Sequence, residues 1–153
     1  MTHELVNGLS SAEAEQVLGL GTRVIVPSGT SLFQLGERAD RLLLVERGRI
    51  KLTLPMQVRG REEDVFVEER GPGQAVGWSA LIPPYRFTLT ATAVHASEVI
   101  TLPREALLKY FSANPVAGHK IALNLAVVVG HRLQLFQTMW LREMQRTVEV
   151  RSA

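Results

Sequence analysis

Cysteine is absent from this chain of 153 residues, and aromatic side chains make up only 6% of it. Without cysteine there is no disulfide framework and no thiolate nucleophile, which fits a reducing compartment, so we expect a cytoplasmic location. The N-terminus has no basic start followed by an apolar core, and it is therefore not a signal peptide. No apolar run reaches the roughly 18 residues of a membrane-spanning helix. The most apolar stretch, residues 121–129, is short and is soon followed by His131 and Arg132.

The chain also lacks a block of charge of one sign. It has 17 basic and 15 acidic residues, a net charge of +2, and the two signs alternate along the sequence. Interspersed charges are typical of a solvated surface, whereas a nucleic-acid-binding protein more often carries a concentrated basic patch. The charge pattern therefore favours a solvated surface over DNA binding.

Enzyme motifs are missing as well. The histidines form no His-x-His pair on a predicted strand, and metal sites need ligands that converge on one point. We find no Ser-His-Asp set, no paired carboxylates and no Walker-type glycine loop. We therefore predict no catalytic residues, no metal site and no enzyme activity. The four histidines are His3, His95, His119 and His131.

What the sequence does contain is a series of short strands after one short helix. Ser10 and Glu13 form a capping-box pattern that starts a helix ending near Leu18, within an N-terminal segment of residues 1–20. From Thr22 to residue 102 the apolar period is two, with strands separated by glycine turns. Arg47-Gly48 predicts the turn of a hairpin between LLLV and IKLTL, and RGREED at 59–64 predicts a charged loop. Such strands are typical of an antiparallel β-barrel or sandwich with flanking helices.

Helical periodicity returns over residues 103–150. REALLKYF predicts a short helix, and Asn114-Pro115 predicts the start of a second helix that runs to about Val150. The first half of this helix is apolar nearly all round, as if it were buried on two sides. Its second half narrows to one apolar stripe, which either pairs with the same helix of a second copy or folds back on its own barrel. We predict that pairing in a homodimer uses Leu133, Phe136, Trp140 and Met144.

Four segments together resemble a known family. They are TSLFQLGE, LLLVERGRIKL, GPGQAVGWSALI and TATAVHASEVITL, and the likeness runs from about Val24 to Arg132. They resemble the cyclic-nucleotide-binding domain, the sensor half of bacterial regulators of the catabolite-activator and FNR type. The resemblance implies a single domain over residues 1–153 with an antiparallel jelly-roll barrel, a long C-terminal dimerisation helix, and cAMP or cGMP as ligand. Its turns coincide with Gly29, Gly36, Gly48 and Gly77.

The stretch VGWSALIPPYRFTLTATA, residues 76–93, is the expected ligand cassette. A glycine followed by one helical turn directs free N–H groups at one point, which suits a phosphate; here the turn is Gly77, Trp78, Ser79 and Ala80. The resemblance further implies a glutamate after the glycine for the ribose hydroxyl and an arginine for the cyclic phosphate. This chain has Trp78 at the first position and Phe87 at the second.

The cassette therefore leaves alternatives open. Arg86 is one residue from the arginine position, and a bulge can re-aim its side chain; otherwise it is a solvated loop residue. Without it, an anion would be held by backbone N–H groups and by the hydroxyls of Ser79 and Thr88. Trp78 either caps the mouth of the barrel or stacks on a flat ligand. Gln137, on the long helix, either contacts a purine edge or is simply exposed.

We interpret the sequence as a small-molecule-sensing regulatory domain for signal transduction, with a cyclic nucleotide or another small anionic ligand in the barrel. The alternative is a dimeric scaffold that has lost ligand binding. A transcription factor of this family carries a helix-turn-helix after the long helix, near where this chain reaches Ala153. We therefore expect a stand-alone sensor or a fragment of a longer regulator, with no direct contact to DNA or membrane.

Overall fold

The computed structural model describes residues 2–152. The N-terminal segment folds into a single turn of 3-10 helix, η1 (Glu4–Val6), followed by helix α1 (Ser11–Leu18). The predicted capping box is confirmed. The Ser10 hydroxyl accepts a hydrogen bond from the Glu13 N–H at 3.1 Å, and the Ser10 N–H donates to the Glu13 carboxylate at 3.1 Å.

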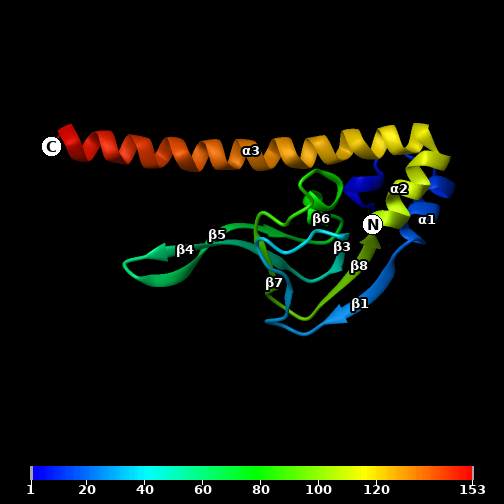
Figure 1. Ribbon diagram of the computed structural model, residues 1–153, viewed down its shortest axis with the longest axis horizontal. Coiled ribbons are helices and arrows are strands. Elements are labelled where there is room, and N and C mark those ends of the chain that lie inside the picture. Colours follow the sequence, from blue (N-terminus) through cyan, green and yellow to red (C-terminus); the bar gives the residue numbers. More distant parts are fainter. Residues whose placement is uncertain (1, 153) are drawn as a thin grey trace.

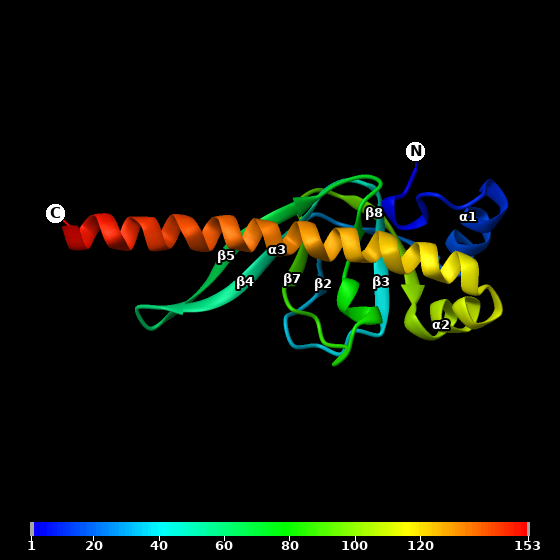
Figure 2. The ribbon, with the colours of Figure 1, turned by 90° about the horizontal axis from the view of Figure 1, so that it is seen from above.

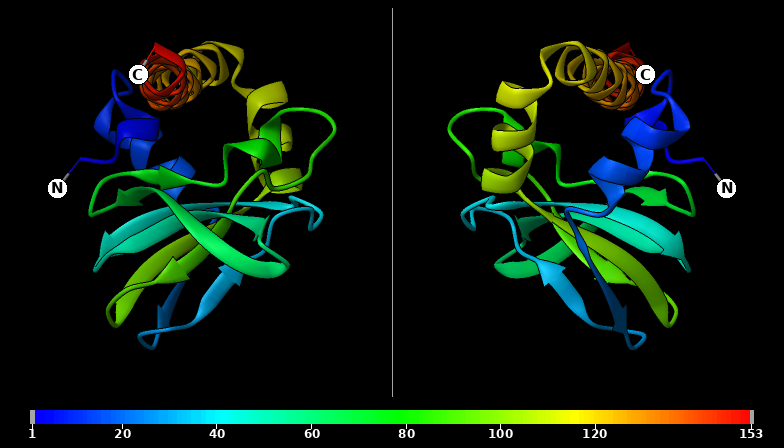
Figure 3. Two further views of the ribbon diagram at one scale, coloured as in Figure 1. Left: turned by 90° about the vertical axis from the view of Figure 1, so that its left-hand side faces the viewer. Right: turned by 90° about the vertical axis from the view of Figure 1, so that its right-hand side faces the viewer.

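Eight strands make two antiparallel sheets that face each other, which confirms the predicted jelly-roll barrel. One sheet has the order β1-β8-β3-β6 and the other has the order β2-β7-β4-β5. Figure 3 shows the two layers below the helices. The strands are β1 (Thr22–Val26), β2 (Ser31–Phe33), β3 (Arg41–Arg47), β4 (Ile50–Val58), β5 (Arg61–Arg70), β6 (Ala75–Val76), β7 (Thr90–Ala93) and β8 (Ser97–Pro103).

Apolar side chains from both sheets meet between them and form one continuous core. Burial of this apolar area is the main favourable contribution to folding. Its largest fully buried members include Leu42, Leu44, Ile50, Phe87, Ile100 and Leu102.

The predicted hairpin at Arg47-Gly48 is wrong. β3 pairs with β8 and β6, whereas β4 pairs with β5 and β7, so the turn carries the chain from one sheet to the other. The turn itself does need glycine. Gly48 has φ 93°, and a Cβ there would lie 2.1 Å from the Ser97 Oγ. The local signal predicted the backbone conformation, but distant strands determined the pairing.

The charged loop predicted at 59–64 is also wrong in extent. β4 and β5 form a hairpin whose turn is only Arg59-Gly60, both with positive φ, and β5 starts at Arg61. Charged residues on this edge strand are compatible with strand structure, since they discourage pairing with other sheets. The outer part of the hairpin projects away from the barrel (Figure 1).

Two helices close the chain, as predicted. Helix α2 (Arg104–Ala113) follows β8, and helix α3 (Pro115–Ser152) continues for 38 residues. At about 1.5 Å per residue, α3 is about 57 Å long. Figure 2 shows it crossing the whole molecule, and Figure 1 shows its C-terminal half extending over the β4–β5 hairpin. Among the described residues, no helix combines the length and the apolar composition needed to cross a bilayer.

The first half of α3 is buried on one side only within this chain. Ile121, Leu125 and Val128 pack on the core, but Leu123 and Val127 are more than half exposed on the opposite side. The expectation of burial on two sides is therefore not met within a single copy. An unpartnered apolar face of this kind remains available for another surface.

Candidate functional site

The cassette begins at Gly77, between β6 and the 3-10 helix η2 (Trp78–Leu81). Gly77 has φ 88°, a left-handed conformation that L side chains rarely adopt. This turn starts η2, in which the Ala80 N–H donates to the Gly77 carbonyl at 3.1 Å. The predicted glycine and helical turn are therefore both present.

Two phenylalanine rings fill the space in front of this turn. Phe87, 2% exposed, stacks on Phe33 with ring centroids 3.7 Å apart and an angle of 9° between the planes. A Cβ on Gly77 would lie 3.0 Å from the Phe87 ring, so the rings press directly on the turn. The Arg41 guanidinium lies 5.4 Å from the centroid of the Phe87 ring, within cation–π range. The barrel interior at this point is thus closed by packing.

The space that remains is a cavity of about 10 Å³. Such a cavity has room for about one water molecule, whereas pockets for small ligands measure roughly 300–1,000 Å³. Five predicted site residues line this cavity together. They are Gly77, Trp78, Ser79, Phe87 and Thr88.

Three predicted site residues lie outside this cavity lining. Arg86 is exposed and donates its Nη1 to the Gly36 carbonyl at 3.0 Å, so no bulge turns it toward the cassette. Ala80 is fully buried in the core. Gln137 is exposed on α3. Trp78 is half-buried at the mouth of the barrel, where it packs against the core.

An arginine that sequence reasoning missed completes the cavity wall. Arg132, on α3, is 8% exposed and lines the same cavity as Gly77 and Phe87. Its spacing carried a signal: Ile121, Leu125, Val128 and Arg132 recur at intervals of three and four and share the buried face of the helix. A lone cation on such a face is a candidate functional group.

Arg132 belongs to a chain of ion pairs between the helix and the barrel. Its Nε donates to Glu68 of β5 at 2.7 Å, and Arg70 Nη1 donates to the other oxygen of Glu68 at 2.9 Å. Arg70 also pairs with Glu4 of η1. Burial lowers the pKa of Arg132 from its ordinary value, and the Glu68 carboxylate opposes that shift. The four side chains connect η1, β5 and α3 through two positive and two negative charges.

An open apolar groove of about 290 Å³ adjoins the cassette on the α3 side. We call it the α3 groove. Arg132 and Trp78 line both the groove and the closed cavity, so the two spaces are neighbours. The groove is lined by Leu54, Trp78, Thr88, Leu89, Val129, Arg132, Leu133 and Phe136.

Comparison with known proteins agrees with this fold. The family described as the cyclic nucleotide-binding domain matches residues 23–114. The chain belongs to the cyclic nucleotide-binding domain family.

Individual relatives extend the likeness beyond the barrel. The cyclic AMP receptor protein of Thermus thermophilus is 28% identical over 130 residues, which is 85% of this chain and 57% of that protein. The crystal structure of the Thermus thermophilus catabolite activator protein has a TM-score of 0.71 at 27% identity, covering 97% of this chain and 63% of that one. A putative cyclic nucleotide-binding protein from Geobacter metallireducens shares the fold, with a TM-score of 0.71 at 24% identity over 86% of this chain and 92% of that one. The chain thus spans less than two thirds of the first two relatives.

Within the cyclic nucleotide-binding domain family, this cassette differs at its two charged positions. Trp78 takes the place expected for glutamate, and the buried ring of Phe87 takes the place expected for arginine. Arg132, a buried cation that lines the cavity together with Gly77, comes from α3 instead of from the barrel.

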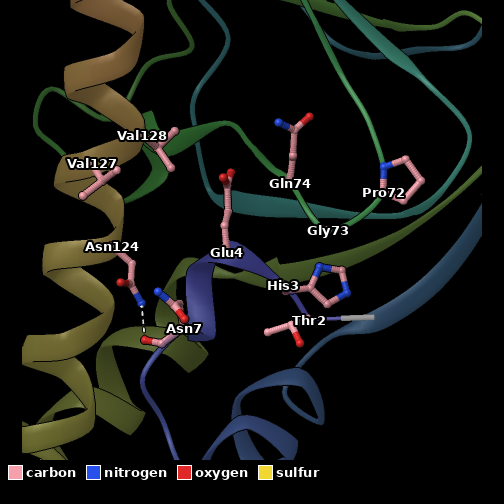
Figure 4. Close-up of a pocket in the computed structure, with 10 residues that line it drawn as sticks. All are labelled: Thr2, His3, Glu4, Asn7, Pro72, Gly73, Gln74, Asn124, Val127 and Val128. Carbon is pink, nitrogen blue, oxygen red and sulfur yellow. Dashed lines mark hydrogen bonds between the residues drawn. The ribbon is translucent and has the colours of Figure 1, made fainter.

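A second hollow, of about 360 Å³, lies beside η1 and α3 (Figure 4). Asn124 of α3 donates hydrogen bonds of 2.8 Å to the carbonyls of Leu5 and Asn7, which ties the helix to the N-terminal segment. The His3 Nε2–H donates to the Glu46 carboxylate at 2.9 Å, and the buried Nδ1 of His3 has no partner within residues 2–152. None of the predicted ligand-binding residues lines this hollow.

The four residues predicted to pair α3 with a second copy do not share one environment. Leu133 and Trp140 are about 60% exposed, at 59% and 61%, and Met144 is exposed too. Phe136 is half-buried and packs on the barrel. Most of the stripe is therefore left uncovered by its own barrel, and only Phe136 follows the alternative of folding back.

Proposed function

We propose that this chain is a dimeric regulatory domain that senses a small anionic ligand other than cAMP or cGMP and transmits its binding through α3. One observation carries the proposal. The ring of Phe87 lies stacked on Phe33 at the position expected for the phosphate-binding arginine, and it leaves a cavity of only about 10 Å³. A family ligand would have to displace a packed aromatic pair and would find no cationic partner at that position.

The energetics of the two substitutions point the same way. A hydrogen bond to a charged group contributes about 1.5–3 kcal/mol. Each such loss reduces affinity by about tenfold or more. Trp78 and Phe87 together remove both charged contacts expected for a cyclic nucleotide. We therefore expect cAMP and cGMP to bind too weakly to regulate this domain.

The proposed dimer rests on an outer stripe of α3. Exposed apolar side chains lie along one face of α3, away from the barrel, and Gly130 on the same face has no atom within 4 Å of a Cβ placed on it. An exposed apolar helix face can pair with the same face of a second copy, and a glycine permits close helix approach. The outer stripe consists of Leu123, Val127, Gly130, Leu133, Trp140, Leu141, Met144 and Val148.

Signal transmission has a physical route in the ion pairs. Glu68 lies in the barrel and Arg132 lies on α3, close to the cassette turn. A ligand that changes this pair changes how firmly α3 is held on the barrel. Because α3 also carries the outer stripe, the dimer and the ligand site are coupled through one helix.

A ligand-free dimeric scaffold is the second candidate function. The stacked rings of Phe33 and Phe87 favour the scaffold, because they already fill the part of the barrel that a ligand would otherwise occupy. In that case the outer stripe would be the functional surface.

Calorimetric titration of purified protein with cAMP and cGMP tests the proposal, together with sedimentation equilibrium for the dimer. We expect no saturable heat at ligand concentrations of about 1 mM and a sedimenting mass of two chains. Micromolar binding of either nucleotide would overturn the choice of ligand class. Arg86→Ala is the matched variant. If a nucleotide binds the original protein but not this variant, the exposed Arg86 must reach the cassette. A monomer at all concentrations would overturn the dimer.

A further inference from the structure

The guanidinium of Arg132 is only partly used within this chain. Its Nε donates to Glu68 at 2.7 Å. Its two Nη groups donate no hydrogen bond to any residue between 2 and 152, although the residue is 8% exposed. The buried side-chain atom without a partner in this part of the chain is the His3 Nδ1, so the Arg132 Nη groups still reach solvent, and they do so where the side chain lines the α3 groove. Both Nη groups are therefore free to donate to an acceptor in that groove.

The surroundings limit what that acceptor can be. Arg132 lines the α3 groove, whose other walls are apolar except for Thr88. The groove volume, about 290 Å³, lies near the lower end of the roughly 300–1,000 Å³ found for small-ligand pockets. A planar guanidinium fork pairs best with a carboxylate or phosphate, through two parallel hydrogen bonds. The ligand is therefore a compact apolar body with one acidic group.

Charge balance separates a carboxylate, with one negative charge, from a phosphate monoester, which carries close to two at neutral pH. Glu4, Arg70, Glu68 and Arg132 form a connected set with two charges of each sign. Arg132 is the only charged side chain among the groove-lining residues. A monoanion adds one uncompensated charge to this neutral set, whereas a dianion adds two in a poorly solvated place. The geometry thus favours a monocarboxylate.

We propose that the α3 groove binds a small apolar monocarboxylic acid, with its carboxylate on the Nη groups of Arg132. The hydrocarbon part would lie between Trp78 of η2 and Phe136 of α3. This inference rests on the proposed function as a sensor of a small anion, and it names the ligand class and the anchoring residue. Such a ligand contacts the barrel and α3 at once, so its binding fixes the helix against η2.

Titration followed by ¹H–¹⁵N NMR tests this directly, with benzoate as the probe and benzamide as its neutral counterpart. The Trp78 indole N–H reports on the groove, and the indole of Trp140, exposed on the outer stripe, serves as an internal control. We expect saturable shifts at Trp78 with benzoate at a Kd of about 1 mM or tighter, and none with benzamide. Equal responses to both probes, or no response to benzoate, would overturn the proposal.

Two variants make the test specific to Arg132. Arg132→Lys keeps a cation beside Glu68 but removes the planar fork, so we expect benzoate to bind at least tenfold more weakly while the fold is retained. Arg86→Ala removes an exposed arginine outside the groove and is expected to leave benzoate binding unchanged. Unaltered binding by Arg132→Lys would also overturn the proposal.

A parallel titration with inorganic phosphate distinguishes this inference from the proposed function. A Trp78 response to phosphate without a response to benzoate would contradict the carboxylate class and still support an anion sensor. Saturable binding of cAMP would contradict the proposed function itself.

Discussion

Replacing Phe87 by alanine tests whether packing closes the cassette. The ring is 2% exposed, is stacked on Phe33 at 3.7 Å, and presses on the Gly77 turn, whose backbone has little freedom to collapse into the gap. A buried Phe→Ala change costs about 3–5 kcal/mol, and aromatic stacking contributes about 0.5–1.5 kcal/mol beyond area. We expect Phe87→Ala to lower the free energy of unfolding by about 4 kcal/mol.

Urea unfolding followed by far-UV circular dichroism measures this loss. With a slope of about 2 kcal/mol per molar urea, the midpoint would fall by about 2 M. Protein concentration must be held constant, because dimerisation adds to the apparent stability. Phe66→Ala is the matched control: Phe66 is 55% exposed, so its loss should cost less than about 1 kcal/mol. A Phe87→Ala cost as small as that of the control would refute the closed cassette.

Three further predictions follow from single contacts. Gly48→Ala should destabilise the domain by about 2 kcal/mol or more in the same urea assay. The reason is that Gly48 has φ 93° and that the new Cβ would lie 2.1 Å from the Ser97 Oγ. A neutral result would contradict the described turn. Gly130→Lys should convert the dimer to a monomer in sedimentation velocity without loss of helix, and a persistent dimer would mean that the outer stripe is not the interface. Burial tends to raise the pKa of Glu46, but hydrogen bonds from His3 and Arg23 and their charges outweigh this, and the net shift is downward. Because the pKa of Glu46 is lower in the folded protein than its ordinary value of 4.5, the ionised carboxylate stabilises the fold above that pH, and the contribution is lost as pH falls through the folded pKa. Glu46→Gln should therefore reduce the loss of stability between about pH 5 and pH 3. An unchanged acid profile would contradict this role.

Local signals in the sequence predicted local structure well. Ser10 and Glu13 form the capping box that their spacing indicated, and α3 runs from Pro115 close to the predicted end. The glycine turn at Gly77 followed by a short helix is present as well. Each of these features depends on residues within one or two turns of each other, which is why periodicity and capping rules identify them.

Features that depend on distant residues were not predictable in the same way. Gly48 does form a turn, as its sequence indicated. The strands before and after that turn pair with β8 and β5, which lie far along the chain, so the local sequence could not identify the pairing. Phe33 was predicted as a strand residue and Phe87 was noted at the arginine position of the cassette, but only the fold stacks their rings. Arg132 was overlooked because its partner Glu68 lies on another element. Sequence reasoning therefore predicted the glycine turn and the short helix of the cassette, but it missed the aromatic pair that fills the space and the cation beside it.

The most direct measurement is an amide-resolved NMR titration of the purified protein with cAMP at concentrations up to about 1 mM. With the Phe33–Phe87 stack closing the cassette, the amide signals of Gly77, Ser79 and Phe87 should not move. Saturable shifts of these signals, with a dissociation constant in the micromolar range, would contradict a cassette closed to cyclic nucleotides.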